Sequence, residues 1–356
     1  MDGEVIPPEA DPGVAVRGDV LSLDALPRVA ARSAPLAHEF EAIVRTERPV
    51  VLKGLLDAWP AVAAGRESAA RLNAYLKAMD IGAQAPVMEA PASSGGRFGY
   101  GPDLREFAFS KRQDGITETL ERIERLMGDP TAPFVAIQML PLASHLPEFV
   151  RQNALPLLPG VMPRLWVGGP LRTQTHNDRD HNLACVVAGR RRFLLFPPEQ
   201  VGALYVGPLD NPPPLSLVDP EAPDLVRFPR YRQAFAAAQV AELGPGDALF
   251  LPKYWWHHVT SRDPYNVMVN YWWGDTATGL ERANDVFLTA LLALKDLPEG
   301  ERSYWKAMFD AYVFGDPGEA TAHIPPGLRG ALGTMSPSAR AALKHQLKMT
   351  YLRSPP

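Results

Sequence analysis

Cysteine is almost absent from this sequence, which contains one, Cys185, among 356 residues. A single cysteine excludes an intrachain disulfide, and it excludes a structural zinc site built mainly from cysteines. It is also typical of a reducing compartment, and the N-terminus shows no basic stretch followed by an apolar run, the pattern of a secretory signal. We therefore expect a cytoplasmic location.

Long apolar runs and a strong charge of either sign are also missing. No uninterrupted apolar run approaches the roughly 18 residues needed to span a bilayer, so we expect no membrane segment. The formal net charge is -4, and the basic residues are scattered apart from the run at 190–192. No extended basic face is predicted, so DNA is not an expected partner.

Apolar residues make up 46% of the chain, which is normal for a packed core. In residues 1–132, helical and strand patterns are mixed, with helical stretches at 36–45, 67–79 and 116–127 and an apolar strand at 49–52. Between 133 and 275, short β-rich runs are separated by glycine and proline, which is typical of a barrel or a sandwich. Helical patterns then return, at 280–295, at 304–313 and from Pro337, with Ser336 as its N-cap.

These patterns predict three regions: an N-terminal α/β region at 1–132, a β core at 133–275 and a helical region at 276–356. The helical region carries more apolar surface than a small flank needs. It either covers the barrel or forms an interface with a second copy, and we favour a homodimer through these helices.

A first candidate for metal binding is the segment His176-Asn177-Asp178. If the segment is an extended strand, His176 and Asp178 project from the same face and can present an imidazole and a carboxylate to one ion. A His-x-Asp triplet also arises often by chance. By itself this segment therefore identifies no site.

A second candidate is the paired His257 and His258, which follow an apolar strand at 246–252 and an aromatic cluster at 254–256. Taken alone, such histidines are more often structural. Neighbouring strand residues face opposite ways, so at most one of the two points inward. Combined with the first segment, the chain offers two imidazoles and one carboxylate, a set that occupies one face of an octahedral iron and leaves the other open.

Two long motifs resemble the cupin-like JmjC oxygenases, of the asparaginyl hydroxylase type that includes factor inhibiting HIF. They are TQTHNDRDHNLACVVAGRRRFLLFPPEQ at 173–200 and GDALFLPKYWWHHV at 246–259, followed by NYW at 270–272. Weaker similarity at 49–54, 59–60 and 96–100 extends the resemblance to about residues 40–275.

The resemblance implies a mainly β fold, a double-stranded β-helix (jelly-roll) core with N-terminal α/β elements and C-terminal helices. It implies a hydroxylase that uses Fe(II), with 2-oxoglutarate as cosubstrate and O2. The metal ligands it implies are His176, Asp178 and His257. Further site positions follow from it: Thr173, Asn182 and Asn270 around the cosubstrate, and Trp272 beside the metal, with Asn270 and Trp272 as the catalytic candidates.

The chain departs from this family at the cosubstrate carboxylate. The family commonly has a lysine two residues after the glycine that corresponds to Gly189, and this chain has Arg191, which keeps the charge and adds a planar fork of donors. A supporting tyrosine is replaced at about Val135. Strand alternation turns Arg191 away from Arg190 and Arg192, so we predict that Arg191 alone points inward and binds the cosubstrate.

Three interpretations stay open. The chain is either a 2-oxoglutarate oxygenase, or a cupin dioxygenase or isomerase that uses the metal without this cosubstrate, or a non-catalytic module that senses metal or cosubstrate. The replacements at Arg191 and Val135 motivate the second, and the intact triad argues against the third. The loops at 90–100 and 208–231 contain no pattern that identifies the substrate, so a protein or peptide side chain is favoured only by analogy.

Overall fold

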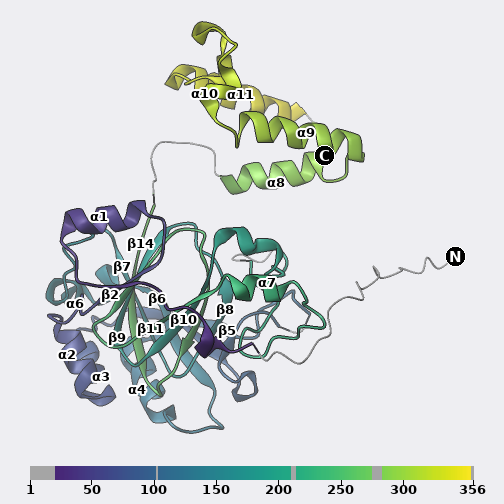
Figure 1. Ribbon diagram of the computed structural model, residues 1–356. Coiled ribbons are helices and arrows are strands. Elements are labelled where there is room, and N and C mark those ends of the chain that lie inside the picture. The colour runs from purple at the N-terminus through teal and green to yellow at the C-terminus, as the bar shows by residue number, and fades with distance from the viewer. Residues whose placement is uncertain (1–20, 102, 210–213, 275–282, 354–356) are drawn as a thin grey trace. The chain divides into compact units, whose positions relative to one another are not determined.

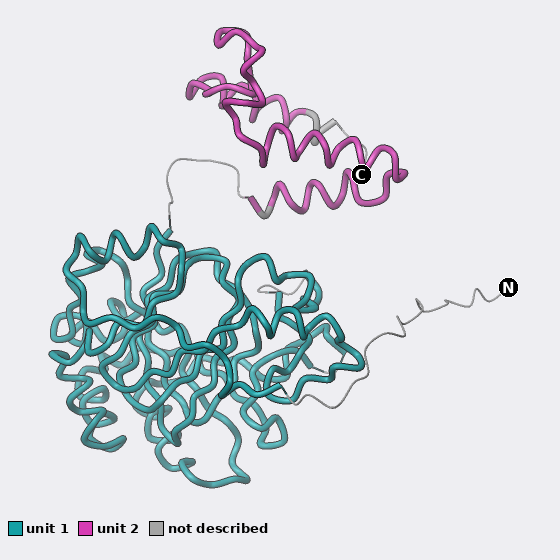
Figure 2. The backbone as a smooth tube through the Cα atoms, in the orientation of Figure 1, with its two compact units in different colours: residues 1–275 teal, residues 276–356 magenta. Residues whose placement is uncertain are grey.

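The computed structural model describes residues 21–101, 103–209, 214–274 and 283–353. The chain divides into two compact units, unit 1 at Met1–Asp275 and unit 2 at Thr276–Pro356, which Figure 2 distinguishes by colour. Unit 1 contains both the predicted α/β region and the predicted β core, whose separation at residue 132 stays a prediction. No described helix is long and apolar enough to cross a membrane.

Within the described residues, the strands of unit 1 form a larger and a smaller sheet (Figure 1). The larger sheet contains, in spatial order, β1 (Ala31–Ser33), β2 (Val50–Lys53), β12 (Ala248–Leu251), β9 (His181–Ala188), β14 (Asn266–Trp273), β7 (Pro163–Gly168), β6 (Phe134–Pro141), β3 (Gln84–Ala90) and β5 (Ser110–Gly115). The smaller sheet contains β11 (Gln239–Leu243), β10 (Arg191–Phe196), β13 (Trp256–Ser261), β8 (Arg172–His176) and β4 (Arg97–Phe98).

The two sheets pack face to face around a shared core. Residues from both line it, among them Ala184 and Val186 of β9 and Phe193 and Leu195 of β10. Because β9 and β10 are consecutive in sequence but lie in different sheets, the chain crosses between sheets as in a jelly roll. This is the double-stranded β-helix predicted from the sequence.

The other face of the larger sheet packs against the N-terminal helices. On β9 the alternate residues Leu183, Cys185 and Val187 face these helices, so β9 is buried on both faces and its sequence is an almost continuous apolar run. The helices of unit 1 are α1 (Ala37–Arg45), α2 (Pro60–Glu67), α3 (Ala69–Lys77), α4 (Ile116–Leu126), α5 (Leu142–His145), α6 (Pro147–Gln152) and α7 (Tyr231–Ala236), the last covering the outer face of the smaller sheet.

A tight turn at Gly189 connects β9 to β10. Its φ of +72° lies in the left-handed region, and a Cβ at this position would come within 2.6 Å of the Tyr265 carbonyl oxygen and would also meet the Asn266 side chain. Only glycine fits there without strain. The turn sends the chain into the smaller sheet, so that β10 begins at Arg191.

The described part of unit 2 contains the helices α8 (Ala283–Leu294), α9 (Glu299–Tyr312), α10 (Pro317–Thr321) and α11 (Pro337–Arg353), joined by loops and short turns. The predicted cap of α11 is confirmed, because Ser336 Oγ accepts a hydrogen bond of 3.1 Å from the Ala339 backbone N–H. The first residues of the helix predicted at 280–295 lie outside the described residues.

Candidate metal centre

His176 and His257 lie directly opposite each other on the paired strands β8 and β13. His257 is also opposite Leu195 of β10, whose side chain lies in the core between the sheets, so both histidines face the inside of the barrel. Their ring centroids are 4.3 Å apart. His258 faces the other way, as alternation predicts, and lines a separate pocket on the outer side of the smaller sheet.

Asp178 does not share a strand with His176, and the prediction that both project from one extended strand is wrong in this respect. Strand β8 ends at His176, and Asp178 lies in the loop that follows. The Tyr254 backbone N–H donates a hydrogen bond of 2.7 Å to the Asp178 carbonyl oxygen, which ties this loop to the segment before β13. The loop therefore holds the carboxylate beside both histidines.

Tyr254 has a φ of +68°, a left-handed conformation that is costly for a bulky residue. It accepts a further hydrogen bond of 3.4 Å from the Asn177 side chain through its carbonyl oxygen. Such local strain is common where a structure holds functional groups in place. Here the strained residue Tyr254 connects the two segments that supply the candidate ligands.

The hydrogen bonds of the two imidazoles determine which ring nitrogen of each is available to bind a metal. His176 Nδ1 lies 2.8 Å from the Gln174 carbonyl oxygen, and His257 Nδ1 lies 3.0 Å from the Trp255 carbonyl oxygen. A carbonyl oxygen only accepts, so each Nδ1 carries the proton and each Nε2 presents a lone pair. Metal-binding histidines are commonly oriented in this way.

The electrostatics also favour neutral imidazole at His257. Burial, followed by the neighbouring His176, lowers the pKa of His257 from 6.5 to about 4, against the opposing effect of Asp178. The side chain is therefore uncharged near neutral pH, which is the form that binds a metal.

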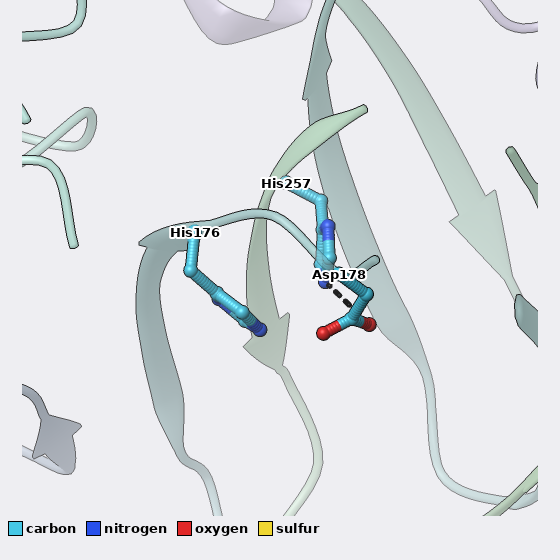
Figure 3. A group of neighbouring side chains, drawn as sticks. All are labelled: His176, Asp178 and His257. Atoms are coloured by element: carbon cyan, nitrogen blue, oxygen red, sulfur yellow. Dashed lines mark ion pairs between the residues drawn. The ribbon is translucent and has the colours of Figure 1, made fainter. Parts of the chain in front are cut away.

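The three side chains converge on one point, as Figure 3 shows. One potential ligand atom of each lies within 4.8 Å of the others, and His257 Nε2 is 3.8 Å from Asp178 Oδ2. Two imidazole nitrogens and one carboxylate could hold an iron(II) ion and leave coordination positions open. Among the described residues no other group of three such side chains comes together.

Trp272 orients the carboxylate of this group. Its Nε1–H donates a hydrogen bond of 3.1 Å to Asp178 Oδ2, which leaves Oδ1 available. The indole ring of Trp272 is in turn supported by Trp166 of β7, with centroids 5.9 Å apart in an edge-to-face arrangement. Trp272, which was predicted to lie beside the metal, thus contacts one of the candidate metal ligands directly.

The other predicted site residues lie on the inner faces of the strands. Thr173 is opposite Val259, and Asn182 is opposite Leu251. Val259 and Leu251 both line the core between the sheets. The Asn270 side chain donates a hydrogen bond of 2.6 Å to Asn182 Oδ1, while its own Oδ1 is buried without a partner. A buried polar atom without a partner is unfavourable unless a ligand satisfies it.

Arg191 faces the interior, as predicted, and is only 7% exposed. Arg190 and Arg192 instead form ion pairs with Asp263 and Glu242. Arg191 Nε has no hydrogen-bond partner, and burial alone lowers the pKa of its guanidinium from its ordinary value to about 10. A buried cation without a counter-charge is costly, so an anion bound here would relieve the cost.

Two inward residues of β7, Arg164 and Trp166, were not predicted from the sequence. They alternate with Leu165 and Val167, which are buried in the outer core. The period of two at 163–168 was the signal that could have revealed them. Trp166 Nε1 is buried and has no hydrogen-bond partner.

Comparison with protein families matches the family described as "Cupin-like domain" over residues 36–279. The chain belongs to this family. Membership agrees with the fold of unit 1 and with the resemblance to cupin-like JmjC proteins predicted from the sequence, which is thereby confirmed. The matched segment contains all the predicted site residues of this cupin-like chain.

Three relatives illustrate the similarity. HSPB1-associated protein 1 of Bos taurus is 36% identical over 147 residues, which are 39% of this chain and 30% of that protein. Lysine-specific demethylase JMJ31 of Arabidopsis thaliana is 33% identical over 150 residues, 42% of this chain and 26% of that protein. Bifunctional peptidase and (3S)-lysyl hydroxylase JMJD7 of Homo sapiens is 27% identical over 268 residues, 66% of this chain and 80% of that protein. The first two matches therefore span less than a third of each relative's length.

Proposed function

We propose that the protein is an Fe(II)- and 2-oxoglutarate-dependent hydroxylase whose metal ligands are His176, Asp178 and His257. The convergence of these three side chains supports the metal site. The buried, unpaired Arg191 is the observation that carries the choice of cosubstrate, because a dicarboxylate supplies the missing negative charge.

The distance along β10 fits this assignment. Arg191 lies four residues before Leu195, which is opposite His257, so it is about 13 Å along the strand from the level of the metal ligands. A long side chain reaching back toward the metal can therefore bind the far carboxylate of a five-carbon keto acid. Thr173, Asn182 and Asn270 line the space between and supply polar contacts to it.

Bound Fe(II), together with 2-oxoglutarate and O2, supplies the oxidising power for C–H hydroxylation. The protein contributes position and charge. The two Nδ1–H···O=C bonds hold the imidazoles with Nε2 free, Trp272 holds Asp178, and Arg191 orients the cosubstrate. The apolar residues between the sheets exclude water from the reacting groups.

Anaerobic titration with Fe(II), with and without 2-oxoglutarate, tests the proposal. We expect a visible metal-to-ligand charge-transfer band that needs both additions, that is lost in His176→Ala and that is retained in the exposed control His38→Ala. Iron binding without the band would favour a cupin enzyme that does not use 2-oxoglutarate. If no iron binds, only the interpretation as a non-catalytic binding module would remain.

We further propose that the substrate is a protein or peptide side chain. One relative is named as a lysyl hydroxylase and another as a lysine-specific demethylase, and both names describe action on amino acid side chains. Incubation with peptides and detection of a mass gain of one oxygen tests this. A cytoplasmic location stays a prediction from the single cysteine.

We also propose a homodimer through the helices of unit 2. Large apolar side chains of this unit are exposed, and among its described residues Thr321 alone is fully buried. The exposed set includes Phe287, Leu288 and Leu292 of α8, and Val313 and Phe314 after α9. Exposed apolar faces of this extent are typical of interfaces. Sedimentation equilibrium tests the proposal, and a monomer at all concentrations would contradict it.

A further inference from the structure

Strand β7 turns a positive charge toward the inside of the barrel. Leu165 and Val167 are buried in the outer core against the N-terminal helices, so Arg164 and Trp166 project from the opposite face. Trp166 packs against the core between the sheets, which confirms the direction. Arg164 is half-buried, so its guanidinium faces the barrel while remaining open to a ligand.

The position of Arg164 is close to the candidate metal centre. It lies directly opposite Asn270 of β14, and Trp272 is the next inward residue of that strand. Trp272 in turn donates its N–H to Asp178. Directly opposed residues have Cβ atoms about 5 Å apart, so a long side chain at Arg164 reaches the space in front of Trp272.

Arg164 has no partner in the part of the chain that the structure describes. No carboxylate there lies within ion-pair distance of it, and no hydrogen bond joins its side chain to a described residue. Asp178 is engaged by Trp272 and is the proposed metal ligand. Beside Arg164 on the same face, the Trp166 N–H also lacks an acceptor.

The two inward arginines have different positions. Arg191 lies at the start of β10 in the smaller sheet, and Arg164 lies at the start of β7 in the larger sheet. The cosubstrate has two carboxylates, one for the metal and one for Arg191 under the proposed function. The charge of Arg164 is then left for another anion.

We propose that Arg164 is a specificity-determining residue that binds a carboxylate of the substrate, so that the protein hydroxylates a residue beside an Asp or Glu in a peptide segment. This inference rests on the proposed function. The guanidinium pairs with the carboxylate through two parallel hydrogen bonds. That pairing fixes the register of the substrate, so that one C–H is held in front of the metal.

The test compares two degenerate peptide pools that differ only in whether Asp or Asn stands at one fixed position. With Fe(II), 2-oxoglutarate and O2, wild-type protein is expected to oxidise the Asp pool about tenfold or more better in kcat/KM, since hydrogen bonds between charged groups discriminate by this much. Arg164→Gln is expected to lose the preference through a higher KM, and Arg164→Lys to restore part of it. Arg32→Gln, at an exposed residue of β1, serves as the matched control.

Charge reversal sharpens the test. Arg164→Glu is expected to prefer a third pool with Lys at the fixed position, an outcome that a purely structural role does not produce. Equal oxidation of the Asp and Asn pools by wild type, oxidation of neither pool, or an unchanged preference in Arg164→Gln would each overturn the inference.

The charge-transfer band separates this inference from the proposed function. We expect the band to persist in Arg164→Gln. Its loss in that variant alone would overturn the inference, since Arg164 would then bind the cosubstrate. Its absence from the wild type would instead contradict the proposed function itself.

Discussion

Replacing Arg191 by methionine removes a buried charge while keeping most of the side-chain volume. Burial lowers the pKa of Arg191 from its ordinary value to about 10, and each tenfold change in proton affinity corresponds to about 1.4 kcal/mol, so the buried charge costs the metal-free protein about 3 kcal/mol. No described acid offsets this cost. Arg191→Met is therefore expected to raise the free energy of unfolding of the metal-free protein by about 1–3 kcal/mol.

The same variant is expected to lose its response to the cosubstrate. Metal-loaded wild type gains about 2.7 kcal/mol of stability at 2-oxoglutarate concentrations of 100 times Kd, and Arg191→Met should gain almost none. Urea unfolding under anaerobic conditions, with and without 2-oxoglutarate, measures both effects, and Arg232→Met at an exposed helical position is the control. A less stable metal-free variant, or one that 2-oxoglutarate still stabilises, would refute the reasoning.

Three further predictions concern the surrounding structure. Trp272→Phe removes the N–H that holds Asp178, and we expect Fe(II) affinity to fall about 10- to 100-fold in a competition titration; unchanged affinity would show that the contact is dispensable. The pKa of His257 is about 4 in the folded protein and 6.5 in the unfolded chain, so the unfolded chain binds more protons between these pH values. The free energy of unfolding of the metal-free protein should therefore fall by up to about 3 kcal/mol as the pH is lowered through that window, which urea unfolding at several pH values measures. Gly189→Ala should lower the free energy of unfolding by more than about 1 kcal/mol in the same assay, because a Cβ at this position meets neighbouring backbone atoms. An unchanged free energy of unfolding would contradict the strain argument.

Local patterns in the sequence predicted several of the elements. The helix expected at 116–127 is α4, because Ile116, Leu120 and Ile123 recur on one face and are buried. The alternation of side chains predicted that Arg191 faces inward while its neighbours face outward. These features depend only on residues within a few positions of one another, so the sequence is sufficient to predict them.

Other elements lack a local signal. Strand β5 (Ser110–Gly115) is polar and exposed, and forms because it pairs with β3 at the edge of the larger sheet. The helix α2, from Pro60, was likewise not predicted, since its small apolar residues resemble the surrounding sequence. In both cases the neighbouring element supplies the stabilising contacts, which propensity alone does not reveal.

The sequence by itself determined which side chains could bind a metal and that Arg191 faces inward while Arg190 and Arg192 face outward. Only the tertiary structure decided that Asp178 reaches the histidines from a loop, that Trp272 holds it, and that Arg164 lies opposite Asn270. The physical reason is register. Alternation along a strand is a local property, whereas the residue that lies opposite on a strand some hundred positions away depends on how the whole sheet is paired.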